Sequence, residues 1–344
     1  MDYLLVFLMP FALSLALTPV AIYIAPKIGA VDIPKDGRRM HDRPMPRFGG
    51  FSIFVGVMAS FAVFLIPGNP GMIGILVCGA LIYILGLIDD LKGMPAKIKF
   101  MGQIAVACVA FAFGIRINFI ASFFYFGLQQ GYAFFSGLTA LILTILWIVG
   151  ITNTINLIDG LDGLAAGVAS LASLSIAYAA YISSGPSAAT LSMLCLAGGG
   201  LGFLPFNFHP AKIFMGDGGA LFLGFMLAAL SIEGATKSAT VVATIAPVLV
   251  LGLPIFDTAF AILRRVVNRR PIMEADKGHL HHRIMAAGFG QRRAVLLLYG
   301  ISGVMGVAAV LLTRNLFAES FALLIIAIVL IYVLLTTSTG ADKK

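Results

Sequence analysis

The feature that most constrains this chain is a series of eleven apolar segments, each roughly 17–25 residues long, a length suited to crossing a bilayer. They cover residues 3–26, 50–67, 71–88, 100–117, 136–153, 163–183, 188–206, 218–234, 239–262, 294–313 and 319–337. A soluble domain is about 25% charged, whereas this chain is 11% charged and 60% hydrophobic. The sequence therefore predicts an all-α polytopic membrane protein with about eleven transmembrane helices, forming one integral domain over residues 1–344.

The positions of the basic residues predict the orientation. If the N-terminus lies outside, all but three of the 23 lysines and arginines fall on the cytoplasmic side; the exceptions are Arg116, Lys237 and Arg314. Cytoplasmic connections carry an excess of Lys and Arg. We therefore expect a cytoplasmic C-terminus and a long basic cytoplasmic loop over residues 264–293. The same bias explains the net charge of +8 without a nucleic-acid partner.

Only fifteen residues are acidic, so their positions carry information. Asp89 and Asp90 end the third segment, Asp159 and Asp162 follow the fifth, and Asp217 precedes the eighth. All five fall at predicted cytoplasmic helix ends. Charged residues at the membrane boundary are costly to bury and tend to mark function. The sequence thus predicts an active site on the cytoplasmic face.

Four polar residues around the end of the fifth segment recur every three positions. They are Asn153, Asn156, Asp159 and Asp162. On a helical turn this spacing places neighbours on one side. Carboxylate and amide oxygens grouped in this way suit Mg²⁺, with Mn²⁺ as an alternative.

Residues 276–283 read Asp-Lys-Gly-His-Leu-His-His-Arg, and place His279, His281 and His282 in the basic loop. Histidines at such spacing first suggest zinc, but no cysteine is near and the acids suit a harder metal. We favour donors for phosphate oxygens and sugar hydroxyls, joined by Arg47, Lys97 and Lys99. A hard metal, cations and a carboxylate are the parts needed for phosphoryl transfer. No Walker A pattern is present, so a P-loop ATPase is not indicated.

Two rival classes, a transporter and a membrane scaffold, fit the sequence less well. Transporter sites typically lie near the bilayer midplane, where the segments here are apolar except at Asp257. For Asp257 two interpretations stay open: an ion pair with Arg264, or a supporting position near the site. Residues 115–135 are irregular and aromatic, which indicates an extracytoplasmic hairpin or an interfacial segment.

Five motifs carry a family resemblance. They are residues 44–50, the Asp89-Asp90 pair, residues 153–163, residues 207–218 and the motif His279-Leu280-His281-His282. With them, nearly the whole chain resembles the polyprenyl-phosphate N-acetylhexosamine-1-phosphate transferases of glycosyltransferase family 4, to which the MraY translocases are related. The resemblance implies transfer of a sugar 1-phosphate from a UDP-N-acetylhexosamine, most simply UDP-GlcNAc, to undecaprenyl phosphate with release of UMP. It also implies that the protein lies in the cytoplasmic membrane of a bacterium. There it would carry out the first membrane step of cell-envelope polysaccharide, lipopolysaccharide or teichoic acid synthesis. A homodimer is possible on this resemblance.

The resemblance also implies residue roles. Asp217 would be the principal Mg²⁺ ligand, with Asn156 as a second. Asp89 and Asp90 would lie near the lipid phosphate, and Lys99 and Lys97 near the phosphates. The residues that would bind substrate are Asn153, Asp159, Asp162, Asn207, Phe214, Arg47 and Arg283. His279, His281 and His282 would read the sugar and phosphates. Because the motif lacks the third consecutive histidine and the glutamate expected of MraY, it favours a simple UDP-N-acetylhexosamine, with the MraY-like reaction as the alternative.

Overall fold

The computed structural model describes residues 2–33, 44–67, 69–121, 132–238, 241–267, 280–286 and 288–339, which are mostly helical. The helices are α1 (Tyr3–Ile24), α2 (Gly50–Phe64), α3 (Ile73–Lys92), α4 (Ala96–Ala112), α5 (Gly137–Ile158), α6 (Leu164–Ser184), α7 (Ala188–Asn207), α8 (Gly216–Ser238), α9 (Val241–Val250), α10 (Gly252–Val267), α11 (Leu280–Ala286), α12 (Gln291–Thr313) and α13 (Phe317–Thr339). A short 3₁₀ turn, Pro70–Met72, precedes α3.

Within these residues, eight helices are long and apolar enough to cross a membrane: α1, α3, α5, α6, α7, α8, α12 and α13. The chain is therefore an all-α polytopic membrane protein. Two further predicted spans correspond to α2, with 15 residues, and α4, with 17 residues. The total of eleven crossings stays a prediction.

The ninth predicted span, residues 239–262, is not one continuous helix. It is divided into α9 and α10, with Leu251 between them. Pro254 has no backbone N–H to donate to the preceding turn, and Gly252 loses more conformational entropy in a helix than other residues. These two residues explain why the continuous apolar pattern does not give a continuous helix.

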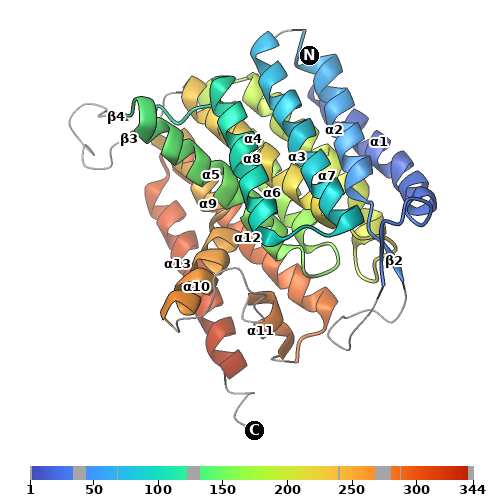
Figure 1. Ribbon diagram of the computed structural model, residues 1–344. Coiled ribbons are helices and arrows are strands. Elements are labelled where there is room, and N and C mark those ends of the chain that lie inside the picture. The colour runs from blue at the N-terminus through green and yellow to red at the C-terminus, as the bar shows by residue number, and fades with distance from the viewer. Residues whose placement is uncertain are drawn as a thin grey trace.

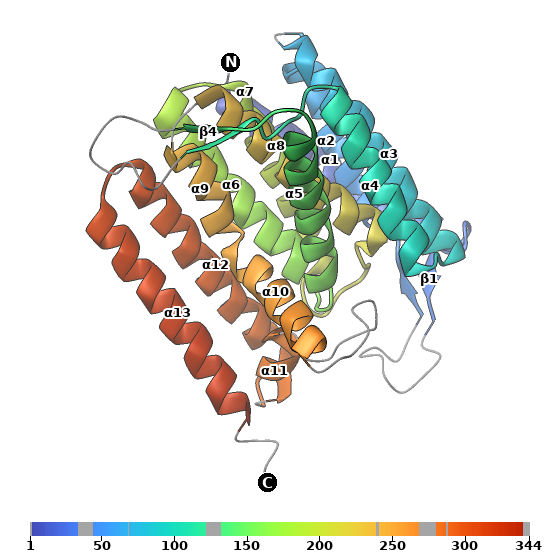
Figure 2. The same ribbon diagram turned by 60° about the vertical axis from the view of Figure 1, so that its left-hand side comes forward.

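The bundle is built around α8, which packs against α3, α5, α6, α2 and α7 (Figures 1 and 2). In its apolar window 89% of residues are buried within the protein, compared with 11% for α13 at the edge of the bundle. The difference fits their sequences, because α8 is rich in glycine and alanine, which permit close helix packing, whereas α13 is rich in Leu and Ile. The first turn of α8 is consequently held at the centre of one end of the bundle.

The two ends of the bundle differ. The N-terminus and an antiparallel pair, β3 (Phe119–Ala121) and β4 (Tyr132–Phe134), lie at one end. The paired strands agree with the hairpin option for residues 115–135, whereas its extracytoplasmic location stays a prediction. At the other end lie α11, the C-terminal end of α13, and a second pair, β1 (Val31–Asp32) and β2 (Met45–Pro46) (Figures 1 and 2). The sequence pattern did not predict β1 and β2, which deliver Arg47 directly to the first turn of α8.

Candidate active site

The centre of the candidate site is Asp217, in the first turn of α8. Its Oδ2 accepts from Arg47 Nη2 at 2.6 Å. Its Oδ1 lies 3.0 Å from Lys99 Nζ and accepts from Asn156 Nδ2 at 2.6 Å. The three partners come from the segment after β2, from α4 and from α5, so one carboxylate joins four separate parts of the fold.

Asp90 and Asp89 have different surroundings, although they are adjacent at the end of α3. Asp90 accepts from the backbone N–H groups of Asp217 at 2.8 Å and Gly218 at 2.9 Å, and its Oδ1 lies 3.0 Å from Arg47 Nε. The first N–H groups of a helix lack partners within the helix and favour an anion. Only 3% of the Asp90 side chain is exposed, so it acts as an anchor between α3 and α8.

Asp89 faces the cation instead. Its Oδ2 lies 2.9 Å from Lys99 Nζ, and its Oδ1 accepts from the backbone N–H of Met94 at 2.6 Å. Lys99 thus bridges Asp89 and Asp217, and its ammonium also donates to Asn156 Oδ1 at 3.3 Å. Lys97 is exposed. Residues two apart on a helix do not share a face, which separates the two lysines. Both lie on α4 rather than in a connection, because the helix begins directly after Pro95.

The close approach of these groups depends on Gly216. Its φ is +77°, and a Cβ built there would lie 2.6 Å from Asp90 Oδ2. Glycine adopts positive φ at little cost, whereas other residues are strained. A glycine at this position therefore lets the Asp90 carboxylate reach the N–H groups at the start of α8.

The cluster holds two cations, Arg47 and Lys99, and three carboxylates, those of Asp89, Asp90 and Asp217. Burial lowers the pKa of Arg47, but the carboxylates of Asp217 and Asp90 raise it further, so it lies above its usual value. Among the described residues, no group of three or more His, Cys, Asp or Glu is arranged to hold a metal ion by itself.

A cleft opens beside the cluster. Its empty volume, open solvent included, is about 1430 Å³. It is lined by Asp32, Met45, Arg47, Asn156, Asp159, Gly160, Leu161, Asp162, Asn207, His209, Pro210, Ala211, Phe214, Met215, Gly216, Asp217 and Gln291. The enclosed part of this space is about 510 Å³, within the range of about 300–1,000 Å³ that is typical of ligand-binding pockets.

The helical spacing predicted for residues 153–162 holds only in part. Asn153 and Asn156 lie on α5, but that helix ends at Ile158, and Asp159 and Asp162 lie in the following loop. The loop turns into α6 at Gly163, whose φ is +80°. Asn156, Asp159 and Asp162 nevertheless reach the same cleft.

Asp159 is half-buried in the wall of the cleft. Burial, and then the nearby carboxylate of Asp217, raise its pKa to about 7. Near neutral pH this carboxyl group is therefore divided between its neutral and ionised forms.

Three predicted substrate-binding residues have partners within the protein. Asn207 is buried, accepts from Gly163 N at 3.0 Å and donates to Ile213 O at 2.9 Å. Asp162 Oδ2 contacts His209 Nδ1 at 2.8 Å. Asn153 does not line the cleft; its amide exchanges hydrogen bonds with Gln103 and donates to Val149 O. The roles predicted for these residues stay predictions.

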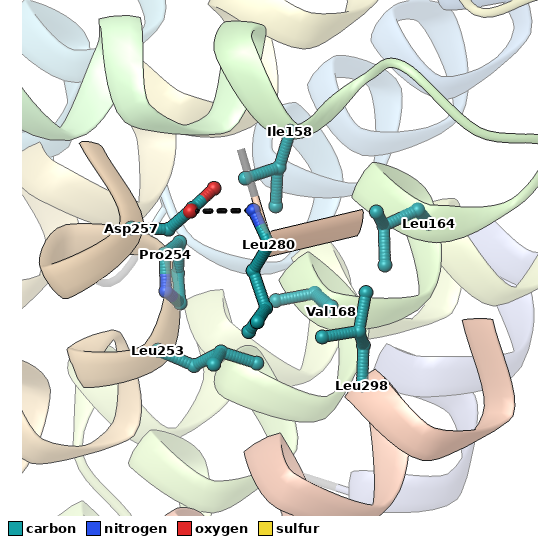
Figure 3. Close-up of a pocket in the computed structure, with 8 residues that line it drawn as sticks. All are labelled: Ile158, Leu164, Val168, Leu253, Pro254, Asp257, Leu280 and Leu298. Carbon is teal, nitrogen blue, oxygen red and sulfur yellow. Dashed lines mark hydrogen bonds between the residues drawn. The ribbon is translucent and has the colours of Figure 1, made fainter. Parts of the chain in front are cut away.

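The histidine motif lies partly outside the described residues. His279 belongs to the part of the chain that is not described, and the side chains of His281 and His282 are not described either. Helix α11 begins at Leu280, whose backbone N–H donates to Asp257 Oδ1 at 2.8 Å (Figure 3). Asp257, on α10, thereby anchors the start of the helix that carries His281 and His282. This contact agrees with a supporting position, and the alternative ion pair with Arg264 stays open. Arg283 lies half-buried on α11.

An apolar pocket lies beneath this anchor. Its lining residues are Ile158, Leu164, Val168, Leu253, Pro254, Asp257, Leu280 and Leu298, around a small cavity of about 20 Å³ (Figure 3). The side chain of Leu280 extends from the anchored backbone in among these residues. The anchor and the buried leucine together fix α11 against α10 and α12.

Sequence reasoning missed Gln103, His209 and Gln291. Gln103 lies four residues after Lys99 on α4 and therefore on the same helical face, a signal that helical spacing could have used. His209 is one of only five histidines, and it stands apart from the motif. For Gln291, near the end of the predicted basic loop, the sequence holds no distinguishing signal.

Comparison with known proteins shows which family of sequences this chain resembles. The profile of glycosyl transferase family 4 matches residues 72–235. The chain is 42% identical over 330 residues to "Probable undecaprenyl-phosphate N-acetylglucosaminyl 1-phosphate transferase" of Bacillus subtilis (strain 168), covering 96% of this chain and 90% of that protein. It is 37% identical over 313 residues to the decaprenyl-phosphate N-acetylglucosaminephosphotransferase of Mycobacterium tuberculosis (strain ATCC 25618 / H37Rv), covering 83% and 76%. It is 24% identical over 316 residues to the undecaprenyl-phosphate alpha-N-acetylglucosaminyl 1-phosphate transferase of Escherichia coli (strain K12), covering 88% and 82%.

Proposed function

Because this chain belongs to glycosyl transferase family 4, we propose that it transfers N-acetylglucosamine 1-phosphate from UDP-GlcNAc to a polyprenyl phosphate, with undecaprenyl phosphate as the acceptor. The names of its relatives support the sugar phosphate and the acceptor class. The single observation that carries the proposal is the convergence of Asp89, Asp217, Arg47 and Lys99 beside a cleft large enough for a nucleotide sugar.

In the proposed reaction, an oxygen of the lipid phosphate attacks the β-phosphorus of UDP-GlcNAc. A new P–O bond forms, the bond from the β-phosphorus to the bridging oxygen breaks, and the electron pair leaves with UMP. The lipid phosphate is largely ionised near neutral pH, so the step needs little help from a base. Positioning and charge neutralisation are the larger contributions.

Arg47 and Lys99 are placed to hold phosphate oxygens. In the described structure Arg47 binds the Asp217 carboxylate, and Lys99 contacts Asp89, Asp217 and Asn156. Because an ammonium has three donors, a phosphate that binds Lys99 would take the place of one of these partners. Charged hydrogen bonds from Arg and Lys to phosphate are among the stronger contacts in proteins. Of the two adjacent acids, Asp90 is engaged by three donors, so Asp89 is the better candidate to face the lipid phosphate.

The donor set fits Mg²⁺. A bound Mg²⁺ commonly keeps several waters and takes one or two carboxylates together with substrate phosphates. Asp217 and the side-chain oxygen of Asn156 would hold it, and its chemistry would be to neutralise the diphosphate as charge develops. This requires a rearrangement of Arg47 or Lys99, which contact Asp217 in the described structure.

We further propose that the cluster faces the cytoplasm of a bacterium. The N-terminus and the β3–β4 pair lie at the opposite end of the bundle from β1–β2 and α11 (Figures 1 and 2). Arg47 and Lys99 belong to the basic end, as the positive-inside bias requires. UDP-sugars are cytoplasmic, and the lipid-linked product would begin a cell-envelope polymer such as lipopolysaccharide or teichoic acid.

The experiment is transfer of radiolabel from UDP-[¹⁴C]GlcNAc to undecaprenyl phosphate by the purified protein with Mg²⁺. We expect a butanol-soluble labelled lipid and release of UMP in equal amount. Asp217→Asn should abolish the product while the protein remains monodisperse in detergent. Lys92→Ala, a control at an exposed lysine at the end of α3, should leave most activity. An absence of labelled lipid across a panel of UDP-sugars would refute the proposed function.

A further inference from the structure

A second pair of side chains in the cleft lies apart from the acid–cation cluster. His209 Nδ1 is 2.8 Å from Asp162 Oδ2, and the same oxygen accepts from the backbone N–H of Ala211 at 3.1 Å. The Asp162 side chain is 16% exposed, whereas that of His209 is 39% exposed. Both residues line the cleft. The carboxylate is thus fixed in the wall, and the imidazole faces the open volume.

This contact determines the hydrogen-bonding character of the ring. An ionised carboxylate only accepts hydrogen bonds, so Nδ1 must carry the proton. In the neutral ring Nε2, on the opposite edge, is then an acceptor. Asp162 thereby holds His209 in one tautomer and one orientation, with an acceptor directed away from the wall.

The neighbouring residues suggest what this acceptor meets. A lone pair repels phosphate oxygens, and the cations that would hold phosphates, Arg47 and Lys99, surround Asp217 instead. Phe214 lines the same cleft and belongs to the same connection between α7 and α8 as His209. An aromatic ring suits the face of a nucleobase, which leaves the edge of the base for a polar side chain.

We propose that His209 is a specificity-determining residue that reads the pyrimidine edge of the nucleotide, and this rests on the proposed function. Nε2 accepts the N3–H of uracil. Cytosine carries an unprotonated N3 at that position, so two acceptors would face each other. The pair Asp162–His209 therefore selects uridine over cytidine nucleotides.

Two substitutions of His209 distinguish a role in binding the base from a role in holding the wall of the cleft together. His209→Asn places an amide N–H where Nδ1 lies, which keeps the bond to Asp162 and removes the distal acceptor. His209→Gln places its side-chain oxygen near the position of Nε2, which keeps an acceptor and gives up the bond to Asp162. A residue with a merely structural role would be rescued by Asn and not by Gln.

The test measures binding of UMP and CMP to the purified full-length protein in detergent with Mg²⁺, by titration calorimetry. Loss of one good hydrogen bond corresponds to roughly a tenfold change in Kd. We expect the unaltered protein to bind UMP at least about tenfold tighter than CMP. His209→Asn should bring the UMP-to-CMP ratio close to one, and His209→Gln should keep part of the preference.

Other results would overturn the inference. If the UMP-to-CMP ratio is unchanged in His209→Asn, His209 does not read the base. If, in addition, the affinities for UMP and CMP fall by the same factor, His209 contacts a part that both nucleotides share, such as the ribose. Thermal unfolding of each variant shows whether it is folded; if His209→Gln fails to fold, His209→Asn decides alone. Lipid labelling by the unaltered protein is measured separately, so failure of the transferase proposal is distinguishable from failure of the base-reading proposal.

Discussion

Arg47 and Asp217 are 170 positions apart in sequence, yet their side chains are joined by an Nη2–Oδ2 contact of 2.6 Å. The same guanidinium reaches Asp90 through Nε at 3.0 Å. One rigid side chain therefore holds together the segment after β2, the end of α3 and the start of α8. The planar, multivalent guanidinium is suited to such a bridge.

Replacement of Arg47 by Lys should be damaging although it keeps the charge. A lysine has one nitrogen and cannot hold Asp90 and Asp217 through separate atoms. We expect Arg47→Lys to lower kcat/KM by roughly ten- to a hundredfold, corresponding to loss of one charged hydrogen bond of about 1.5–3 kcal/mol. Steady-state kinetics with UDP-GlcNAc measure this. Activity close to that of the unaltered enzyme would contradict a bridging role.

Removal of divalent metal should stop the reaction without unfolding the protein. The carboxylates of Asp217 and Asp90 have cationic or N–H partners within the protein, and these partners can compensate their charge when the ion is removed. We expect EDTA to abolish lipid labelling, Mg²⁺ to restore it, and the thermal unfolding temperature to change little. Restoration by zinc but not by Mg²⁺ would contradict the assignment of a hard metal.

The hydrogen-bonded pair Gln103–Asn153 should help to hold α4 against α5 and so keep Lys99 in position. Gln103 is 1% exposed, and its amide exchanges hydrogen bonds with Asn153 across α4 and α5, one turn from the Lys99–Asn156 contact. Gln103→Leu leaves the half-buried Asn153 amide without its Gln103 partner, and a buried group left unpaired typically costs about 1–3 kcal/mol. We expect a lower unfolding temperature and a lower kcat.

The matched control for this pair is the double variant Gln103→Leu with Asn153→Leu. Replacing both partners by apolar groups of similar shape can be nearly neutral. The double variant should therefore recover much of the unfolding temperature lost in the single variant. If it is less stable than the single variant, the pairing is not the source of the effect.

Asp159 should make the metal-free protein less stable as the pH rises towards 7. Its pKa is about 7 in the folded protein, compared with an ordinary value of 3.8. Between these values the folded state binds the proton and the unfolded state does not, so its contribution to stability falls with rising pH. The loss of stability that ionisation of Asp159 causes in the folded protein is absent below about pH 4 and complete above about pH 7.

The variant Asp159→Asn isolates this contribution. Its unfolding temperature should exceed that of the unaltered protein by a few degrees at pH 8, and the difference should shrink as the pH falls to 5. Thermal unfolding in detergent with EDTA across this range is the measurement. A difference that is constant with pH would show that Asp159 does not titrate there.

Much of this fold could be predicted from the apolar pattern, because the length and hydrophobicity of a segment decide whether it forms a membrane helix. The break between α9 and α10 was missed because hydrophobicity alone does not register the effect of Gly252 and Pro254 on the backbone. The small pair β1–β2 was also missed, since two-residue strands have no periodic signal.

For the site, the amino-acid sequence alone determined that scarce polar residues would gather at helix ends on one face, since the cost of burying charge in a membrane permits few other places. Tertiary structure alone decided the partners: that Asp90 anchors α8 while Asp89 faces Lys99, that Asn153 turns to Gln103, and that Asp162 holds His209. These pairings join residues far apart in the chain. The rotation of each helix about its axis and the path of each loop settle them, and both follow from how the whole bundle packs.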